Sequence, residues 1–549
     1  MLTDAPNSDP VLIVGGGPSG LVVAAELARR DIPARIIDIA REATDKSKAI
    51  GIQARTLELL NNFGIVDEFT SRGHQVVGAN IFHDSKQLAH ISLSEIDSPF
   101  HYILILPQNE TETILTKYLG SLGVSIEREV KLSGFTQNEE GVTASLVHAD
   151  GTEEEFKTPW LIGCDGSHST VRHLLNLPFK GEEYLEGYQL ADIKLDWRFN
   201  NDELYVFMHN GRVLAVFPMP EGRHRLIADR PPEETPTDQS PTLEEWQELV
   251  NERCPAITTL SDPLWTANYR IHRRLVPDIR MRRVFLVGDA AHIHSPAFAQ
   301  GMNTGIQDGI NLAWKLALVI QGGSNAKLLE SYQAERYPVE RDVLQATDVP
   351  FELLGFTNPI ATAVRDTLIT AATSFEPVRK LMRGFVSETG ISYSTSGIVE
   401  EHGLSAGPHA GQRIFDCTVG ANNGQKFGMF DLLRDPEHKA LIFEPLTITD
   451  EAVDEVSKTV DVFRQILGSR VKTHRFSSSM DTSNKRDAED FVYSAYEGSL
   501  VEKLGALKGA VYLIRPDNYV AFRSPLTGAS NLLRDYLNKV FRAKAETTL

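Results

Sequence analysis

A glycine-rich motif near the N-terminus contains the first residues whose types and spacing point to chemistry. Gly15, Gly17 and Gly20 follow the apolar run Val11–Val14, and residues with helical periodicity come after them. In a strand–turn–helix unit, the first glycine permits a tight turn, the second lets the backbone approach a pyrophosphate, and the third allows close helix–strand packing. The N–H groups at the start of the helix then face the phosphates. The residues expected to surround the phosphates are Gly15, Gly17, Pro18, Ser19 and Gly20.

An acidic residue follows the next strand-like run. Asp38 lies near the end of Ala34–Ile39, 18 residues after Gly20. At that position a carboxylate can accept hydrogen bonds from a ribose. The flanking strand, the helix and this aspartate together favour a dinucleotide-binding unit over a chance pattern of glycines.

Two further motifs lie far along the chain, each after a short apolar run. The sequence CDG, Cys164–Gly166, follows Trp160–Gly163, and the sequence GDAAH, Gly288–His292, follows Val284–Val287. Asp289 would therefore meet a ligand hydroxyl at the carboxyl end of a buried strand.

The loop after the third motif leads to the clearest expected helix, residues 302–320. Its N-terminus carries partial positive charge and free N–H groups, which would stabilise the negative charge of a reduced isoalloxazine. Taken in order, the three motifs predict FAD held in extended form. For each motif alone, the alternative is an ordinary turn or a capped helix without a ligand.

His292 and His294 raise the question of a metal site. Their i, i+2 spacing does not suit a pair of ligands on one helix face. We therefore expect a structural role for these histidines and no metal ion.

The composition bounds the class of protein. A chain of 549 residues is expected to form two or three domains. Its formal net charge of -19 would repel a phosphate backbone, which argues against nucleic-acid binding. Its three cysteines lack CxxC spacing, which fits a reducing, cytoplasmic location. The polar N-terminus is unlike a signal peptide, and no apolar run is long enough to span a bilayer, so membrane insertion is not expected.

The periodicity predicts an α/β fold with an inserted sheet. Residues 1–178 and 272–388 are expected to form a Rossmann-like FAD-binding domain, the second part ending in a helical connection. Residues 179–271 alternate between polar and apolar, as in an antiparallel sheet that would bind the substrate. A stretch rich in Gly, Pro and Ser at 389–408 precedes a C-terminal domain, residues 409–549.

Together with other short stretches, these motifs resemble the class A flavoprotein monooxygenases, the p-hydroxybenzoate hydroxylase superfamily. The C-terminal part, with AGQR at 410–413 and LIRPD at 513–517, resembles the thioredoxin-like tail of the phenol- and polyketide-hydroxylase branch. Because this tail has no CxxC pair, it is expected to support packing or dimerisation rather than redox chemistry. The stretches that carry the resemblance before residue 345 are GGGPSG (15–20), RTLE (55–58), LPQ (106–108), CDGSHSTVR (164–172), RVFLVGDAAHIHSP (283–296), QGMNTGIQDG (300–309) and NLAWKLA (311–317).

The resemblance implies roles for further residues. Asp289 would bind the ribityl chain of FAD, Gln108 would approach the flavin, and Asp165 would contact FAD indirectly or the passing nicotinamide. Pro296, Gln300 and Asn303 would line the reactive flavin edge as the catalytic loop. The residues assigned to the cofactor, beyond the phosphate loop and Asp38, are Lys48, Gln108, Asp165, Asp289, Gly301, Met302 and Asn303.

The resemblance also implies a reaction. NADPH or NADH would reduce FAD, and dioxygen would add to give a C4a-hydroperoxide that transfers a hydroxyl to a phenolic or polyketide-like ring. The partners would be a small aromatic substrate and dioxygen. The alternatives are the same chemistry used to inactivate an antibiotic, a flavin-dependent halogenase, and a flavin-binding scaffold without turnover. A halogenase is disfavoured because the dedicated lysine- and tryptophan-bearing motif is missing.

The substrate would lie between the inserted sheet and the flavin. Tyr205, Met208, Arg212 and Phe217 are expected to line it, but alternation alone does not say which side of the sheet faces inward. Phe298 stands where many relatives carry a small residue, so it is expected to reshape the flavin-edge loop. No general base is assigned, and the candidates are Tyr269, His272 and His294.

Overall fold

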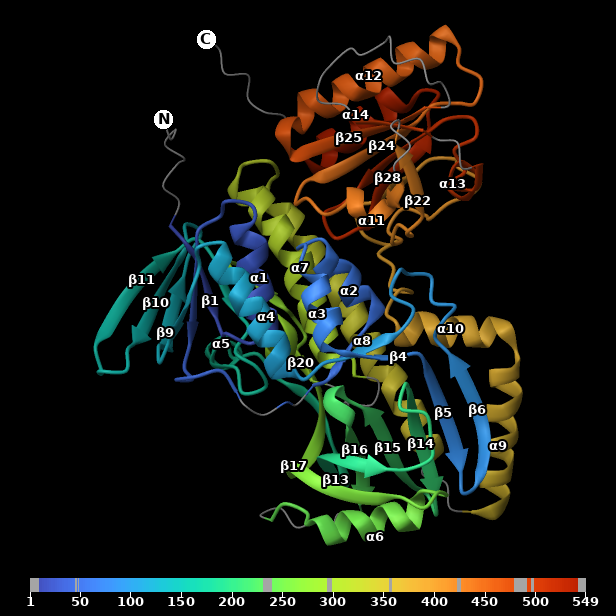
Figure 1. Ribbon diagram of the computed structural model, residues 1–549. Coiled ribbons are helices and arrows are strands. Elements are labelled where there is room, and N and C mark those ends of the chain that lie inside the picture. The colour runs from blue at the N-terminus through green and yellow to red at the C-terminus, as the bar shows by residue number, and fades with distance from the viewer. Residues whose placement is uncertain are drawn as a thin grey trace.

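The computed structural model describes residues 9–44, 47, 49–230, 239–293, 299–354, 358–421, 426–477, 491–494 and 498–541. Figure 1 shows three stacked parts, with the C-terminal residues in orange and red at the top. Helices from the first half of the chain lie in the middle, and a second large sheet lies at the bottom. No helix among the described residues is long and apolar enough to cross a membrane.

A six-stranded sheet forms the framework of the middle part. Its strands β1, β2, β8, β12 and β19 are parallel, and β18 pairs antiparallel at one edge. The strands predicted at Val11–Val14 and near Ala34–Ile39 are confirmed, because all of β1 and the centre of β2 are buried in the main core. In spatial order the strands are β18 (Arg280–Met281), β19 (Val284–Leu286), β12 (Leu161–Gly163), β1 (Val11–Val14), β2 (Ala34–Asp38) and β8 (Ile126–Arg128).

Three helices pack together beside this sheet. The helix α1 (Pro18–Ala28) follows β1 directly and packs against both α7 (Gly301–Ile320) and α4 (Gln108–Ser121). The predicted helix at 302–320 is confirmed, but nearly every side of α7 is buried, not just an apolar face. Its buried polar residues, which the apolar pattern alone did not single out, are Asn303, Thr304, Gln307, Asp308, Asn311 and Lys315.

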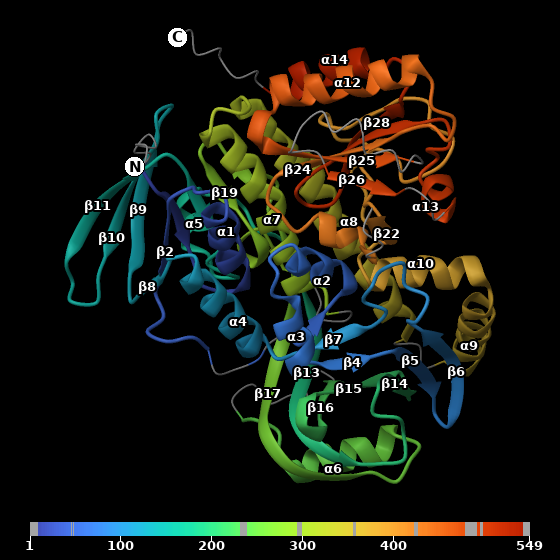
Figure 2. The same cartoon turned by 45° about the horizontal axis from the view of Figure 1, so that its top comes forward.

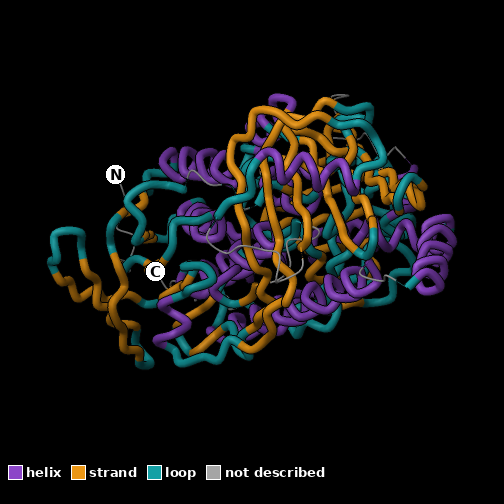
Figure 3. Tube along the Cα trace, turned by 90° about the horizontal axis from the view of Figure 1, so that it is seen from below, coloured by secondary structure: helices purple, strands orange, loops and turns teal. Residues whose placement is uncertain are grey.

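A second, eight-stranded sheet forms the bottom of the molecule. Its long strands β13 and β17 pair with each other in antiparallel orientation. Figure 3 views the sheet from below, where its strands run side by side. Two of its strands, β5 and β6, come from before residue 179, so the sheet extends beyond the expected range 179–271. In spatial order the strands are β20 (His292–Ile293), β17 (Thr259–Leu275), β13 (Lys180–Asp196), β16 (Arg223–Arg230), β15 (Arg212–Pro218), β14 (Glu203–His209), β5 (Gly78–His83) and β6 (Lys86–Ser92).

The helix α6 (Leu243–Arg253) covers the outer face of this sheet. It begins with a capping box, in which Thr242 accepts from the Glu245 amide and the Glu245 side chain accepts from the Thr242 amide. Trp246 of α6 is buried against the sheet. One face of the sheet is therefore closed, and the other looks toward the middle part (Figure 1).

The C-terminal unit, residues 400–541 as far as they are described, contains a third large sheet. Its helices α12 (Asp450–Ile466) and α14 (Ala529–Val540) lie together above the sheet in Figure 2. The apolar core beneath them also takes in Trp314 and Leu318 of α7, so the unit packs directly on the middle part. In spatial order the strands are β21 (Glu400–Glu401), β28 (Val520–Pro525), β27 (Ala510–Ile514), β24 (His438–Phe443), β25 (Val471–Ser477), β26 (Phe491–Ser494), β22 (Thr418–Ala421) and β23 (Lys426–Gly428).

The remaining elements connect these parts. The helix α8 (Glu330–Leu354) packs against α7, and α9 (Pro359–Ser374) covers β6 at the edge of the second sheet. The other elements used below are β3 (Gly51–Ile52), β4 (His74–Val76), β7 (Ile103–Ile105), α2 (Ala54–Asn61), α5 (Thr170–Leu174) and α10 (Glu376–Val386). A small antiparallel sheet of β9 (Lys131–Gln137), β10 (Val142–Val147) and β11 (Glu153–Thr158) flanks the middle part.

Candidate functional site

The three sequence motifs meet in space. A Cβ atom built on Gly15 would lie 2.3 Å from the carbonyl oxygen of Cys164, so the first and second motifs are in backbone contact. A Cβ atom on Gly288 would lie 2.7 Å from the Ser19 hydroxyl oxygen, and one on Gly305 would lie 2.5 Å from it. Glycine is thus required at these points because the strand ends, α1 and α7 approach too closely for a side chain. The convergence that the motif order predicted is present.

The glycine loop has the form of an anion site. A Cβ atom built on Gly17 would meet no heavy atom within 4 Å, whereas one on Gly20 would lie 2.0 Å from the Gly15 carbonyl oxygen. Gly17 is also the N-cap of α1, and no side chain caps this end of the helix or adds an acid to its first turn. Open space before uncapped N–H groups fits a phosphate group.

Asp38 braces this loop from the end of β2. Its Oδ2 accepts from the Gly16 amide at 2.6 Å, and its Oδ1 accepts from the Ala40 amide at 2.7 Å. The Arg128 guanidinium lies 3.6 Å from Oδ2. Each carboxylate oxygen can accept a second hydrogen bond, so the predicted contact with a ribose hydroxyl remains geometrically available.

The second and third motifs place their aspartates differently. Asp289, on the short helical turn η3 (Gly288–Ala290), is exposed at the end of β19, where a ligand could reach it. Asp165 accepts from the Ser169 hydroxyl at 2.5 Å and from the Val171 amide at 3.1 Å. Burial raises the pKa of Asp165. The Asp165 carboxylate therefore organises the start of α5, and its indirect contact with FAD or its contact with the nicotinamide stays a prediction.

Side-chain hydrogen bonds fix the N-terminus of α7 against its neighbours. Asn303 is buried, and its side-chain oxygen accepts from the Gln53 amide at 2.9 Å. Its side-chain nitrogen donates to the carbonyls of Gly51 at 2.9 Å and Ala299 at 2.7 Å. These bonds hold the loop against β3, and the expectation that Asn303 lines the flavin edge stays a prediction. Ala299 adopts a φ of 53°, in the left-handed region that favours glycine.

The neighbouring predicted residues occupy the same corner. Gln300 is buried and donates from its side-chain nitrogen to the carbonyl of Phe385 at 3.1 Å. Although Gln300 is the N-cap residue of α7, its side chain makes no capping hydrogen bond. Gly301 begins α7, and Met302 packs partly buried against the main core. Gln108, at the start of α4, donates to Glu112 at 2.9 Å and accepts from the Ala49 amide at 3.3 Å. Lys48, His294, Pro296 and Phe298 lie outside the described residues.

The substrate-wall candidates fall on different parts of the sheet. Tyr205 is wrong for this role, because it is 3% exposed in the core under α6 and its hydroxyl accepts from the Asn200 amide. Arg212 is held by Asp229 at 3.3 Å. Phe217 lies on the opposite face and packs, partly buried, against the cluster that β4 and β7 contribute to. The strand register therefore shows which face of the sheet each side chain occupies, which the alternation of polar and apolar residues did not determine.

Tyr269 lies on the same inner face as Phe217. Antiparallel registers link Tyr269 to Tyr188, Leu190 to Ile227, and Ile227 to Ala215, so these residues share that face. The Tyr269 hydroxyl is buried and has no hydrogen-bond partner within the described part of the chain, and burial raises the pKa of Tyr269. Of the other candidate bases, His294 is outside the described residues, as is the side chain of His272.

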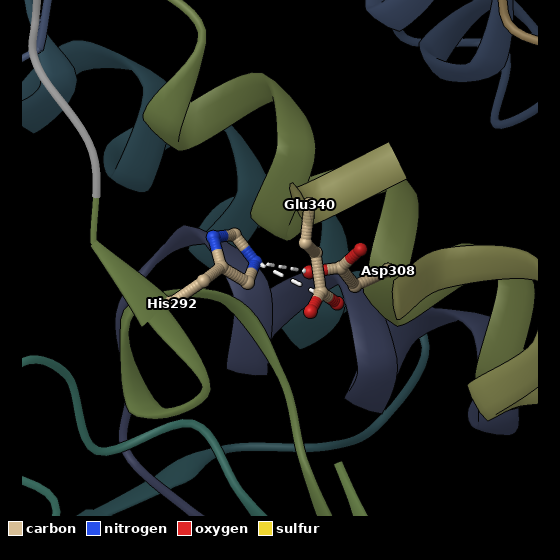
Figure 4. A group of neighbouring side chains, drawn as sticks. All are labelled: His292, Asp308 and Glu340. Atoms are coloured by element: carbon tan, nitrogen blue, oxygen red, sulfur yellow. Dashed lines mark hydrogen bonds and ion pairs between the residues drawn. The ribbon is translucent and has the colours of Figure 1, made fainter. Parts of the chain in front are cut away.

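A buried ionic cluster lies directly behind the third motif. The His292 ring points toward two carboxylates in Figure 4, with Nε2 at 2.8 Å from Asp308 Oδ2 and 3.9 Å from Glu340 Oε1. The Arg336 Nε donates to the other Asp308 oxygen at 2.6 Å, and the Gly288 amide lies 3.2 Å from Oδ2. Asp308 thus ties α7 to α8 and to the turn that carries Asp289. Sequence inspection missed Asp308, although a charge inside an apolar helical pattern was visible.

The charges of this cluster favour protons over a metal ion. Ligand atoms of His292, Asp308 and Glu340 lie within 4.8 Å of one another, a spacing that could hold a cation. Arg336 already supplies one positive charge, and once Glu340 is ionised a protonated His292 makes the four side chains neutral in sum. Burial lowers the pKa of His292, but the carboxylates of Glu340 and Asp308 outweigh it and raise that pKa to about 9. A divalent cation would have to displace that proton.

Glu340 is expected to make the stability of the protein depend on pH. Burial, followed by the nearby Asp308 charge, raises the pKa of Glu340 to about 7 from 4.5. The folded protein therefore keeps a proton that the unfolded chain loses above pH 4.5. Because of this difference, the contribution of Glu340 to the free energy of unfolding falls as pH rises from 4.5 to 7. Glu340→Gln should reduce that fall in the unfolding free energy by about 2–3 kcal/mol. Urea unfolding at several pH values measures this change, and Asp342→Asn, at an exposed carboxylate, is the control. If the unfolding free energy of Glu340→Gln falls with pH as steeply as that of the wild type, the role assigned to Glu340 is wrong.

Comparison with known proteins agrees with this geometry. A family model described as an FAD binding domain matches residues 8–347. The pentachlorophenol 4-monooxygenase of Sphingobium chlorophenolicum is 31% identical over 526 residues, covering 94% of each chain. The 6-methylpretetramide 4-monooxygenase of Streptomyces rimosus is 32% identical over 535 residues, covering 95% of this chain and 92% of that one.

Solved structures show the same likeness over nearly the whole chain. An anhydrotetracycline hydroxylase from Streptomyces rimosus superposes with a TM-score of 0.74 at 27% identity, covering 97% of this chain and 99% of that one. The match spans the second sheet and the C-terminal unit as well as the glycine motifs. The chain therefore belongs to the FAD-binding-domain family of aromatic monooxygenases.

Proposed function

We propose that this enzyme uses NADPH or NADH and dioxygen to hydroxylate a neutral phenolic or polyketide-like aromatic ring. The observation that carries the proposal is the accessible apolar face of the second sheet, which looks toward the converged motifs. FAD, when bound, supplies the oxygen-activating chemistry. The residues of this chain bind the cofactor, orient the ring and exclude water.

The FAD site is proposed along the converged motifs. The pyrophosphate would lie over Gly17 and the uncapped start of α1, with the adenosine ribose at Asp38 and the ribityl chain at the exposed Asp289. Asn303 would act by fixing the loop before α7, so that the helix N-terminus faces the isoalloxazine. Gln108, Gln300, Gly301 and Met302 remain proposed neighbours of the cofactor. For Lys48, Pro296 and Phe298 the sequence expectation stands alone.

The two faces of the second sheet differ in exposure, and this difference points to a ligand. Residues on the α6 face, such as Phe207 and Leu226, are completely buried. Several apolar residues on the inner face are only half-buried, although the middle part of the molecule stands opposite them, whereas Leu190 and Met208 on that face are buried. An accessible apolar wall beside a cofactor site is typical of a pocket for an aromatic ligand. The half-buried residues of this wall are Val206, Ala215, Phe217, Ile227, Ala267 and Tyr269.

The charge on this face supports a neutral substrate. Arg225 is buried on the inner face, where its Nε and Nη2 donate to the two Asp192 oxygens at 2.7 and 2.6 Å. The Trp265 indole also donates to Asp192, at 2.8 Å. Because Asp192 neutralises this guanidinium, Arg225 is not available to recruit a carboxylate. The names of the relatives, which include a pentachlorophenol and a 6-methylpretetramide monooxygenase, are consistent with phenolic rings.

The purified holoenzyme tests the proposal directly. Its flavin spectrum should be that of bound FAD, and oxidation of NADPH or NADH should accelerate with one class in a panel of neutral phenols and polycyclic polyketides. Mass spectrometry should then find that substrate with one added oxygen atom. A yellow protein whose NADPH and NADH oxidation responds to no aromatic compound, with no oxygenated product, would overturn the proposal. Faster turnover with benzoate-type acids than with their neutral analogues would overturn the choice of a neutral substrate.

Tyr269 is proposed to donate a hydrogen bond to an oxygen of the substrate. Its buried hydroxyl has no partner among the residues that the structure describes, and a buried donor without a partner costs free energy unless a ligand supplies an acceptor. Tyr269→Phe should therefore lower kcat/KM by about 3- to 10-fold, the effect of one neutral hydrogen bond. Tyr205→Phe is the matched control, since its hydroxyl is on the other face. Equal kcat/KM values for Tyr269→Phe and wild type would refute the role.

The domain division is also part of the proposal. Residues 1–178 and 272–388 would form the FAD-binding domain, and residues 179–271 would supply most of the substrate sheet. The C-terminal residues 409–549 would be thioredoxin-like: β24 runs parallel to β25 across α12 and antiparallel to β27, and the β27–β28 hairpin is followed by α14. The three free cysteines support a reducing, cytoplasmic setting, and dimerisation through the tail remains a prediction.

A further inference from the structure

One turn of the C-terminal unit reaches into the middle part of the molecule. Residues 515–518 join β27 to β28 and lie against α2, α7 and α8. We propose that this turn is a positioning element for the FAD site, so that docking of the C-terminal unit and binding of FAD are coupled. The proposal rests on FAD binding by the converged motifs.

Arg515 makes the central contacts of the turn. Its two Nη atoms donate to the two oxygens of Glu335 on α8, both at 2.8 Å. Its Nε and Nη2 donate to Asp517 at 2.9 and 2.6 Å. Glu335 also accepts from Asn311 at 2.8 Å and from Lys315 at 2.7 Å, both on α7. The guanidinium therefore completes a buried cluster that α7 and α8 cannot complete by themselves.

Asp517 and its neighbours extend the contact to α7 and α2. The Trp314 indole of α7 donates to Asp517 at 3.2 Å. The backbone carbonyl of Asp517 accepts from Arg55 of α2. Asn518 and Asn62, at the end of α2, exchange side-chain hydrogen bonds at 3.0 and 3.3 Å. One turn thus holds α2 and α7 at a fixed spacing.

Both helices contribute directly to the candidate flavin corner. The α7 helix begins at the loop that Asn303 secures, and Gln53, which supplies the amide bonded to Asn303, is the N-cap of α2. A sliding movement of α2 against α7 would strain that bond. The turn therefore acts on the flavin site through the two helices and not through contact with the cofactor.

Because its central side chains are buried, we expect the turn to be either fully docked or fully undocked. Arg515, Glu335 and Asp517 have side chains no more than 4% exposed. Moving the turn away would remove the Arg515 guanidinium from Glu335, which would keep only Lys315 as a cationic partner, and losing one partner of a buried ion pair is strongly unfavourable. If FAD binds better to the docked arrangement, then docking must in turn be strengthened by FAD to the same degree.

Hydrogen–deuterium exchange of the wild-type protein tests this coupling without any substitution. Peptides covering 510–526 and α14 should exchange at least 3-fold more slowly with saturating FAD than after FAD removal, as should the peptide covering α1. Protection of α1 with unchanged exchange in 510–526 and α14 would overturn the coupling. If FAD slows exchange in none of these peptides, including the one that covers α1, then the proposed FAD site itself is wrong.

Substitution of Arg515 supplies the second test. Arg515→Gln should weaken FAD binding at least 10-fold and lower the reduction potential of the FAD-saturated enzyme, because the N-terminus of α7 would no longer be held against the isoalloxazine. Arg515→Lys keeps the charge but not the two-pronged geometry and should be intermediate. Arg534→Gln, an exposed arginine of the same unit, is the control and should stay within 2-fold of wild type. A folded Arg515→Gln protein with wild-type FAD affinity and potential would refute the proposal; if that variant does not fold, the exchange experiment decides.

Discussion

Replacing Asp308 with alanine is expected to lower the free energy of unfolding by about 3–5 kcal/mol, as for other broken buried ion pairs. The Asp308 carboxylate is completely buried between Arg336 and His292. Its removal would leave the Arg336 guanidinium without its carboxylate and would free the Gly288 amide that Asp308 accepts from. Because that amide begins the turn carrying Asp289, the variant should also lose most of its flavin during purification.

Urea unfolding and the ratio of flavin to protein absorbance measure these two effects. Asp342→Ala is the matched control, because Asp342 is a carboxylate on the neighbouring α8 with a side chain 65% exposed and paired with the exposed Arg341. The control should change the unfolding free energy by less than about 0.5 kcal/mol. A loss of less than about 1 kcal/mol in Asp308→Ala, well below the range for a broken buried pair, would contradict the proposed role of the cluster.

Two glycines of the phosphate loop are expected to respond in opposite ways to alanine. Gly17 has an extended backbone, with φ of -80°, and open space where its Cβ would lie. Gly17→Ala should therefore leave stability within about 0.5 kcal/mol of wild type and weaken FAD at least 10-fold, equivalent to about 1.4 kcal/mol. Gly20→Ala places Cβ 2.0 Å from the Gly15 carbonyl oxygen and should cost about 1–3 kcal/mol or more in stability.

The pair of variants separates packing from ligand binding. Thermal unfolding of the FAD-free proteins reports the effect on packing, and fluorescence titration with FAD reports the affinity. If Gly17→Ala binds FAD as tightly as wild type does, the pyrophosphate does not lie over Gly17, and the proposed position of the cofactor is wrong. If Gly20→Ala is as stable as wild type, the close contact between α1 and the first strand end is not required.

Local patterns were sufficient for much of the framework. The runs at Val11–Val14 and 302–320 became β1 and α7 because apolar periodicity reflects burial that any compact fold must satisfy. The glycine spacing was equally informative, since Gly15 and Gly20 are needed for backbone contacts that no other residue allows. The family resemblance rests on these same residues.

The sequence by itself determined which segments converge at the candidate FAD site, because glycine spacing and strand–turn–helix order are properties of short stretches of chain. Only the tertiary structure decided that Tyr205 lies under α6 while Tyr269 and Phe217 face inward, since a strand shows alternation but not direction. It also decided that Asp308 meets His292 and Arg336, and that Arg515 joins α8. Those contacts join residues from 16 to 180 positions apart, and the value of a buried charge depends on which partner the fold brings to it.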